Sequence, residues 1–276
     1  MAVLRIFSYL PNPRVWKATI AARFCGVDLE VRGASAKELK DWLWDYDARP
    51  LADNERDTAI ARTGRVGLTG AQLFKTDAFL EAQPFGNVPA AFGPDGKAGI
   101  FESNSIMRAV ARLGQSQLYG QDAYEASRID SFLDASLIFA RDSQIYLLSL
   151  LDGSVTQAIQ ARTMESFAIY ASGLEQALSP DRRTLVGDGL SLADICFACE
   201  LALFMNEHQR GDKLRERGLG KILHQDFDQQ YPRVAAHFTR LLGHEHFKVE
   251  LEPYVRKLMA AAALEKGMPD RSFAQR

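Results

Sequence analysis

The hydrophobic pattern of this 276-residue chain changes its period near residue 122. Before that point, short apolar runs with strand character alternate with short helical segments. After it, long amphipathic segments carry apolar residues at helical spacing, and no further strand pattern follows. A chain of this length can hold one large domain or two small ones, and the change of pattern favours two. We therefore predict an α/β domain over residues 1–114 and an all-helical domain over residues 121–276, joined by Gly114–Gly120.

The first thirty or so residues predict a strand, a helix and a second strand. Residues 3–8 form an apolar run, and Asn12-Pro13 then offers an N-cap followed by a proline at the first helical position. The helix predicted over residues 14–25 ends at Gly26, and residues 27–31 alternate between apolar and polar side chains. A helix between two strands favours parallel pairing through a right-handed crossover.

Residues 85–106 combine strand, turn and helix-start signals. Val88-Pro89 leads into an apolar strand, and Gly93–Gly96 predicts a hairpin turn before the next strand. Proline at a strand entrance makes Val88-Pro89 a candidate for a cis peptide bond. We expect Ser103 to cap a helix over residues 104–113, whose positive end would attract a carboxylate. A hairpin leading into a capped helix explains the same residues without a ligand.

Residues from about 36 to 72 do not follow this order. Trp42, Trp44 and Tyr46 lie within five residues among acidic side chains, and their spacing does not keep to one helical face. Two interpretations remain open. The segment is either an insertion whose aromatic residues pack on its own domain, or an interface or pocket wall, because exposed aromatic clusters mark contact surfaces.

The second half of the chain contains one specific local motif, at the start of a predicted helix. Ser191-Leu192-Ala193-Asp194 has the Ser-x-x-Asp spacing of a capping box at the start of a helix predicted over residues 192–206. Cys196 and Cys199 have a redox or metal spacing, but they lie inside this apolar helix without a second pair, so we interpret them as core and predict no metal site. The other predicted helices cover residues 123–151, 155–178, 233–242 and 253–264.

Composition excludes several classes of partner and compartment. The net charge of −2 gives no electrostatic reason to expect nucleic acid or an anionic membrane as a partner. No apolar run approaches the ~20 residues of a membrane span, and the first residues lack the features of a signal peptide. Three cysteines do not make a disulfide framework. We therefore expect a cytoplasmic protein.

Taken in order, these segments resemble the glutathione transferase family. The resemblance is carried by the strand–helix–strand of residues 3–31, by Asn87-Val88-Pro89-Ala90, by residues 101–106 and by residues 191–195. It implies a thioredoxin-like α/β N-terminal domain followed by an all-α domain, with the segment near 36–72 as an insertion. Residues 9–18 and 88–104 also resemble the transferase-like domain of the elongation factor 1 gamma subunit and bacterial transferases of the lignin beta-etherase kind.

The resemblance implies a glutathione site between the Val-Pro strand and the start of the following helix. Val88, which precedes the expected cis Pro89, would pair its backbone with the cysteinyl part of glutathione. Glu102 would bind the ammonium of the gamma-glutamyl end, and Ser103, with Asn104 beside it at the helix N-terminus, would bind the carboxylate. Opposite charge and a helix N-terminus suit these two groups.

The group that activates the glutathione thiol is harder to place. In the family, a Tyr, Ser or Cys just after the first strand, or an Asn at the start of helix one, donates a hydrogen bond to the thiolate, which is the reactive form. The candidates here are Ser8, Tyr9 and Asn12, with Arg14 nearby, and we favour Asn12, then Ser8. The side chain of Asn12 could instead be occupied in capping its own helix. Leu10 stands where serine-type relatives place their activating residue.

Two functions follow from the resemblance. The first is a glutathione transferase, in which the thiolate attacks a small hydrophobic or aromatic electrophile held against the helical domain. Displacement of a phenol from an aryl ether, as in lignin degradation, is one version of this reaction. The second is a non-catalytic structural or partner-binding subunit, as in elongation factor 1 gamma. Either form would be a homodimer or a heterodimer with another transferase chain.

Overall fold

The computed structural model describes residues 3–56, 59–64, 68, 70–180, 182–224 and 226–266, with side chains as far as residue 260. Its contacts divide the chain into two compact units. The first unit comprises Met1–Ile129 with Gly189–Cys196, and the second comprises Asp130–Asp188 with Phe197–Arg276. The domain limits 1–114 and 121–276 stay a prediction.

The first unit begins with the predicted strand, helix and strand. Strand β1 (Leu4–Tyr9) is followed by helix α1 (Pro13–Cys25) and strand β2 (Leu29–Ala34), which pairs with β1 in parallel. Asn12 caps α1 as predicted: its Oδ1 accepts the Arg14 N–H at 3.0 Å. Gly26 ends the helix in a left-handed conformation, with φ of 64°, which costs glycine little because it has no Cβ. The second strand starts two residues later than predicted.

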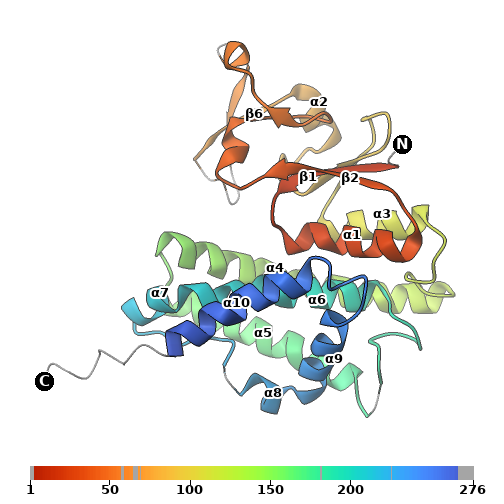
Figure 1. The fold of residues 1–276 in the computed structure, drawn as a ribbon, viewed down its shortest axis with the longest axis vertical. Helices are drawn as coiled ribbons and strands as arrows, with labels where there is room; N and C mark the ends of the chain where they lie inside the picture. The colour runs from red at the N-terminus through yellow and green to blue at the C-terminus, as the bar shows by residue number, and fades with distance from the viewer. Residues whose placement is uncertain are drawn as a thin grey trace, which may run out of the picture. The chain divides into compact units, whose positions relative to one another are not determined.

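A hairpin completes the first sheet. Strands β7 (Ala90–Phe92) and β8 (Gly99–Phe101) are antiparallel, and β7 also pairs antiparallel with β1, so the sheet order is β2-β1-β7-β8. The peptide bond Val88-Pro89 is cis, as the sequence suggested. Figure 1 shows α1 and α3 (Ser103–Leu113) on one side of β1 and β2, and strand β6 (Gln72–Lys75) with helix α2 (Asp77–Ala82) on the other.

The predicted insertion forms a second four-stranded sheet with the order β4-β3-β6-β5. Its strands are only two to four residues long, which is too short for a period-two pattern to stand out in the sequence. The elements of this region are η1 (Glu38–Asp41), β3 (Trp42–Trp44), β4 (Arg49–Pro50), η2 (Asp53–Glu55), β5 (Ala61–Thr63), β6 (Gln72–Lys75) and α2 (Asp77–Ala82). Most of β6 and all of α2 lie beyond the predicted limit near residue 72.

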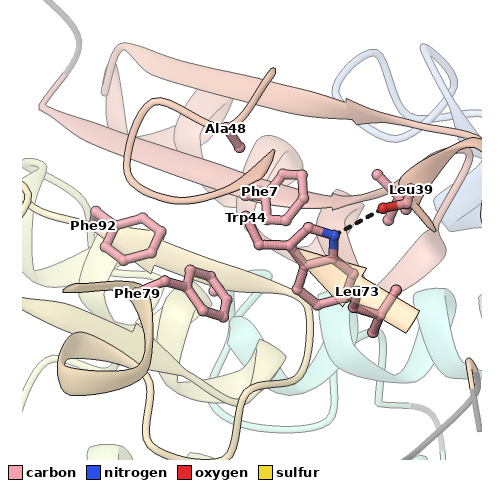
Figure 2. Packing of buried hydrophobic residues seen from close by; sticks show 8 residues of the cluster. Phe7, Leu39, Trp44, Ala48, Leu73, Phe79 and Phe92 are labelled. Atoms are coloured by element: carbon pink, nitrogen blue, oxygen red, sulfur yellow. Dashed lines mark hydrogen bonds between the residues drawn. The ribbon is translucent and has the colours of Figure 1, made fainter. Parts of the chain in front are cut away.

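The tryptophans of the insertion pack on their own unit, which decides between the two interpretations of this segment. Trp44 is buried, its Nε1–H donates to the Leu39 carbonyl at 2.9 Å, and its ring lies edge-on to Phe7 with 5.3 Å between centroids (Figure 2). Trp42 stacks on the same phenylalanine at 6.0 Å. Because alternate strand residues face opposite sides, Phe7 presents its ring to the second sheet while its neighbours in β1 face the other way.

The second half of the chain is helical, and all five long helices appear within a few residues of their predicted limits. They are α4 (Ala123–Asp152), α5 (Gln157–Ala177), α6 (Leu192–Phe204), α9 (Pro232–Leu242) and α10 (Leu251–Lys266). The structure adds three short elements that the sequence patterns did not predict: η3 (Met205–Arg210), α7 (Gly211–Glu216) and α8 (Phe227–Gln230). Within the described residues, every helix is too short or too polar to cross a bilayer.

In a capping box the serine hydroxyl accepts the backbone N–H of the residue three positions later. At α6 the Ser191 hydroxyl makes a different contact. The Asp194 carboxylate accepts the Ser191 backbone N–H at 2.8 Å, as predicted. The Ser191 hydroxyl, however, donates to the same carboxylate at 2.9 Å. Both side chains are buried. The carboxylate is a strong acceptor, and the Ser191 hydroxyl therefore donates to it instead of accepting a backbone N–H.

Candidate functional site

The loop before β7 is held by one buried glutamine. Gln83 is fully buried; its Oε1 accepts the Phe85 and Gly86 N–H groups at 2.8 and 3.0 Å. Its Nε2 donates to the Asn87 carbonyl at 2.7 Å and to the Asn87 side chain. One side chain therefore fixes three consecutive backbone positions immediately before Val88.

A lysine supports the same loop. The Lys75 ammonium, at the end of β6, donates to the Gly86 carbonyl at 2.6 Å and lies 4.9 Å from the centre of the Trp44 ring. Its side chain is buried. The second sheet thus contributes to placing the Val88-Pro89 entrance of the first sheet.

Replacing Gln83 with methionine should lower the free energy of unfolding by about 1–3 kcal/mol, because it removes the side-chain hydrogen bonds that hold Phe85, Gly86 and Asn87. Methionine has a similar length but offers neither donor nor strong acceptor. Urea unfolding of the two proteins measures the difference. The exposed Gln72 is the matched control, and Gln72→Met should change stability by less than about 0.5 kcal/mol. Equal effects of the two substitutions would contradict the role of Gln83.

Helix α3 begins one residue earlier than predicted, and Ser103 is not its cap. Glu102 occupies the N-cap position, and no side-chain hydrogen bond caps the helix. Ser103 is therefore the first residue of the helix. The prediction was wrong because Glu102 adopts φ of 66° and ψ of 123°, the one positive φ among non-glycine residues in the described part of the chain. Such backbone geometry is rare outside glycine and cannot be read from the residue type.

Glycine at position 102 tests this backbone strain. Glu102→Gly should leave the free energy of unfolding unchanged or raise it by up to about 1 kcal/mol, because glycine adopts positive φ without steric cost while its flexibility stabilises the unfolded chain. Glu102→Ala is the matched control, since it removes the same exposed carboxylate but keeps Cβ. We expect the glycine variant to be the more stable of the two in thermal unfolding. The opposite order would show that the Glu102 backbone is not strained.

The start of α3 rests on a buried lysine from α1. Lys17 is 1% exposed, and its Nζ donates to Asn104 Oδ1 at 2.8 Å and to Ser103 Oγ at 3.3 Å. The sequence motifs did not single out this residue. Its spacing was nevertheless a signal: Lys17 precedes Ile20 and Ala21 by three and four residues, which puts it on the buried face of α1. Lysine is rarely buried without a specific partner.

The two favoured thiol-activating candidates lie together. Asn12 Nδ2 donates to Ser8 Oγ at 3.1 Å, and both side chains are fully buried. Asn12 Oδ1 is occupied by the cap of α1, which was the alternative role considered for it. Tyr9 and Arg14 are both half-buried, and Tyr9 packs against the aromatic cluster of the second sheet.

The cysteine pair of α6 has no metal-site surroundings. Cys196 and Cys199 are buried and not in a disulfide, and the Cys196 thiol donates weakly to Asn104 Oδ1 at 3.4 Å. No group of three or more His, Cys, Asp or Glu side chains able to hold a metal ion occurs in the residues that the structure describes. The interpretation of this pair as core is in accord with these surroundings.

The strand register brings the two ends of the candidate site together. Ala90 on β7 lies opposite Phe101 on β8, so the cis Val88-Pro89 entrance and the Glu102-Ser103 helix start lie at the same end of neighbouring strands. Neighbouring antiparallel strands lie about 5 Å apart. Val88, Pro89, Glu102, Ser103 and Asn104 therefore lie close together in the first unit. Ser8 and Asn12 belong to β1 and the start of α1.

Comparison with protein families matches residues 152–245 to the glutathione S-transferase C-terminal domain. A glutathione S-transferase-like protein FUS3 of Gibberella moniliformis is 28% identical over 88% of this chain and 90% of its own length. The protein of the same name from Gibberella fujikuroi is 31% identical over 62% of this chain and 76% of its own. A probable elongation factor 1-gamma of Arabidopsis thaliana is 26% identical over 98% of this chain, which spans 56% of that protein's length.

Solved structures share the fold. A glutathione S-transferase of Methylobacillus flagellatus with glutathione bound matches 89% of this chain and 97% of its own, with a TM-score of 0.58 and 16% identity. The transferase URE2P8 of Phanerochaete chrysosporium with oxidized glutathione matches 94% of this chain and 98% of its own, with a TM-score of 0.60 and 17% identity. The fold is thus the predicted one, a thioredoxin-like N-terminal domain followed by a helical domain.

Proposed function

Because the chain belongs to the glutathione S-transferase superfamily, we propose that it binds glutathione at the cis Val88-Pro89 entrance and the start of α3 and transfers it to an electrophile. The observation that carries the proposal is the register that aligns these two segments, with a helix N-terminus that no side chain caps. First-turn N–H groups and the helix dipole favour a carboxylate at this point.

Each residue of the site has a role in the proposal. The Val88 backbone pairs with the cysteinyl part of glutathione. The exposed Glu102 carboxylate binds the gamma-glutamyl ammonium. Ser103 donates its hydroxyl to the gamma-glutamyl carboxylate, and Asn104 contributes its backbone N–H, since its side-chain oxygen is already bonded to Lys17.

In this proposal, the Ser8–Asn12 pair activates the glutathione thiol. Asn12 Nδ2 donates to Ser8 Oγ, so the Ser8 hydroxyl proton remains to be donated to a thiolate. A donor of this kind lowers the pKa of the thiol and raises the reactive fraction. The Ser8 and Asn12 side chains are both buried. The glutathione thiol must therefore reach the end of β1 to contact the Ser8 hydroxyl. Ser8→Ala is the cleaner test, because Asn12 also caps α1.

The reaction proposed is attack of the thiolate on an electrophilic carbon of a small hydrophobic or aromatic substrate, so that a C–S bond forms while the halide or phenolate on that carbon leaves with the bonding electron pair. Titration of the purified chain with glutathione, followed by turnover with a nitro-activated aryl halide, tests it. We expect saturable binding and a rate that depends on both substrates. An aryl ether in place of the halide tests the beta-etherase version of the reaction. Absence of glutathione binding would overturn the whole proposal.

The elongation factor 1-gamma relatives favour a second candidate, because the match to the Arabidopsis protein extends over 98% of this chain. In this form the chain binds glutathione without turnover of its own and serves as a structural or partner-binding subunit. Turnover assays with and without a second transferase chain, with the oligomeric state established by light scattering, distinguish the two. Turnover by the homodimer alone supports the enzyme, whereas turnover only in a heterodimer, or none in either state, supports the subunit.

A further inference from the structure

The buried ammonium of Lys17 lies behind the proposed glutathione site. Placing a charged group away from water is costly unless it is hydrogen-bonded, and Lys17 is 1% exposed. Its contacts with Ser103 and Asn104, at 3.3 and 2.8 Å, are both to the first two residues of α3. The positive charge therefore adds to the positive end of the helix dipole at that place.

The chemistry of the ammonium sets the direction of these hydrogen bonds. An ammonium has three donors and no acceptor, whereas a serine hydroxyl has one donor and two acceptor sites. In the contact with Lys17, Ser103 Oγ must therefore accept. Its single proton is left to be donated to another group. The Asn104 side-chain oxygen also accepts from Lys17.

We propose that Lys17 is a positioning and specificity residue for the carboxylate of the gamma-glutamyl end. It turns the Ser103 hydroxyl into a donor and adds a positive charge behind that hydroxyl. This inference rests on the proposed function and deepens it. It gives the site a selectivity for thiol peptides that carry a free carboxylate at the gamma-glutamyl end over those that lack it.

A cycle between protein and ligand tests the role of Lys17. Binding of glutathione and of gamma-aminobutyryl-cysteinylglycine, which lacks only the gamma-glutamyl carboxylate, is measured by calorimetry for the wild-type chain and Lys17→Met. We expect Lys17→Met to weaken glutathione binding by about tenfold or more, the effect of losing a charge-assisted contact. Its affinity for the analogue should change by less than about twofold. The exposed Lys97, replaced by methionine, is the matched control and should leave both affinities unchanged.

Two other outcomes would contradict the inference about Lys17. Equal losses for the two ligands would show that Lys17 only supports the fold and would overturn the inference while leaving the proposed function intact. No binding of glutathione to the wild-type chain would overturn both. Circular dichroism checks that each variant is folded. If Lys17→Met is not folded, Lys17→Gln serves in its place, because its amide can donate to the same two oxygens without the charge.

Discussion

Replacing Glu207 with alanine should lower the free energy of unfolding by about 3–5 kcal/mol, since each buried donor left unpaired costs about 1–3 kcal/mol. The Glu207 carboxyl group is buried in the second unit. It accepts the Tyr146 hydroxyl at 2.7 Å and the N–H groups of Ile222 and Leu223 at 2.7 and 2.9 Å. Urea unfolding measures the loss. Glu165→Ala, an exposed glutamate on α5, is the control and should cost less than about 0.5 kcal/mol.

Titration of Glu207 also makes the stability of the folded protein depend on pH, in a defined direction. Burial raises the pKa of Glu207 above its ordinary value of 4.5, despite the three hydrogen bonds that favour the ionised form. The folded protein therefore holds this proton more tightly than the unfolded chain. The stability that this adds is fully present below pH 4.5 and is lost as the pH rises through the raised folded-state pKa.

The glutamine side chain of Glu207→Gln does not titrate. Comparison with this variant therefore isolates the contribution of Glu207 to the pH dependence of stability. We expect the stability difference between the wild-type chain and Glu207→Gln to favour the wild type most at acid pH and to shrink as the pH rises. Thermal unfolding of both proteins across this range measures the difference. A gap that widens with rising pH would mean that the folded-state pKa of Glu207 lies below its ordinary value.

Removing the Ser103 hydroxyl should weaken glutathione binding by about 10- to 100-fold, because a hydrogen bond to a charged carboxylate contributes about 1.5–3 kcal/mol. The structure makes this hydroxyl available as a donor: it does not cap α3, and it accepts from Lys17. Calorimetric titration of Ser103→Ala measures the loss. Ser103→Thr keeps the hydroxyl and should retain affinity within a few-fold. Unchanged binding by the alanine variant would remove Ser103 from the site.

Much of the fold could be predicted because its signals are local. Asn12-Pro13 and Gly26 define both ends of α1, and the stripes of the long helices appear within single segments. The second sheet could not be predicted, because its strands are only two to four residues long and β3 pairs with β6, which lies far along the chain. Trp42 and Trp44 contact Phe7, which lies more than thirty residues earlier in the chain.

The candidate site was predictable to a different degree at each residue. The sequence order suggested the cis Val88-Pro89 bond and the polar start of α3, and the structure has both. It could not show the positive φ of Glu102, which moves the cap by one residue and releases Ser103 from capping. Nor could it show that Lys17, on another helix, contacts Ser103 and Asn104, since tertiary packing alone brings α1 to α3.

A crystal structure of the chain grown with glutathione is the most direct measurement of the proposed site. We expect the gamma-glutamyl carboxylate within hydrogen-bonding distance of Ser103 Oγ and the Asn104 N–H, and the cysteinyl backbone paired with Val88. The ammonium should lie beside Glu102. Glutathione bound at another surface, or none at a concentration well above the measured dissociation constant, would contradict the site at the start of α3.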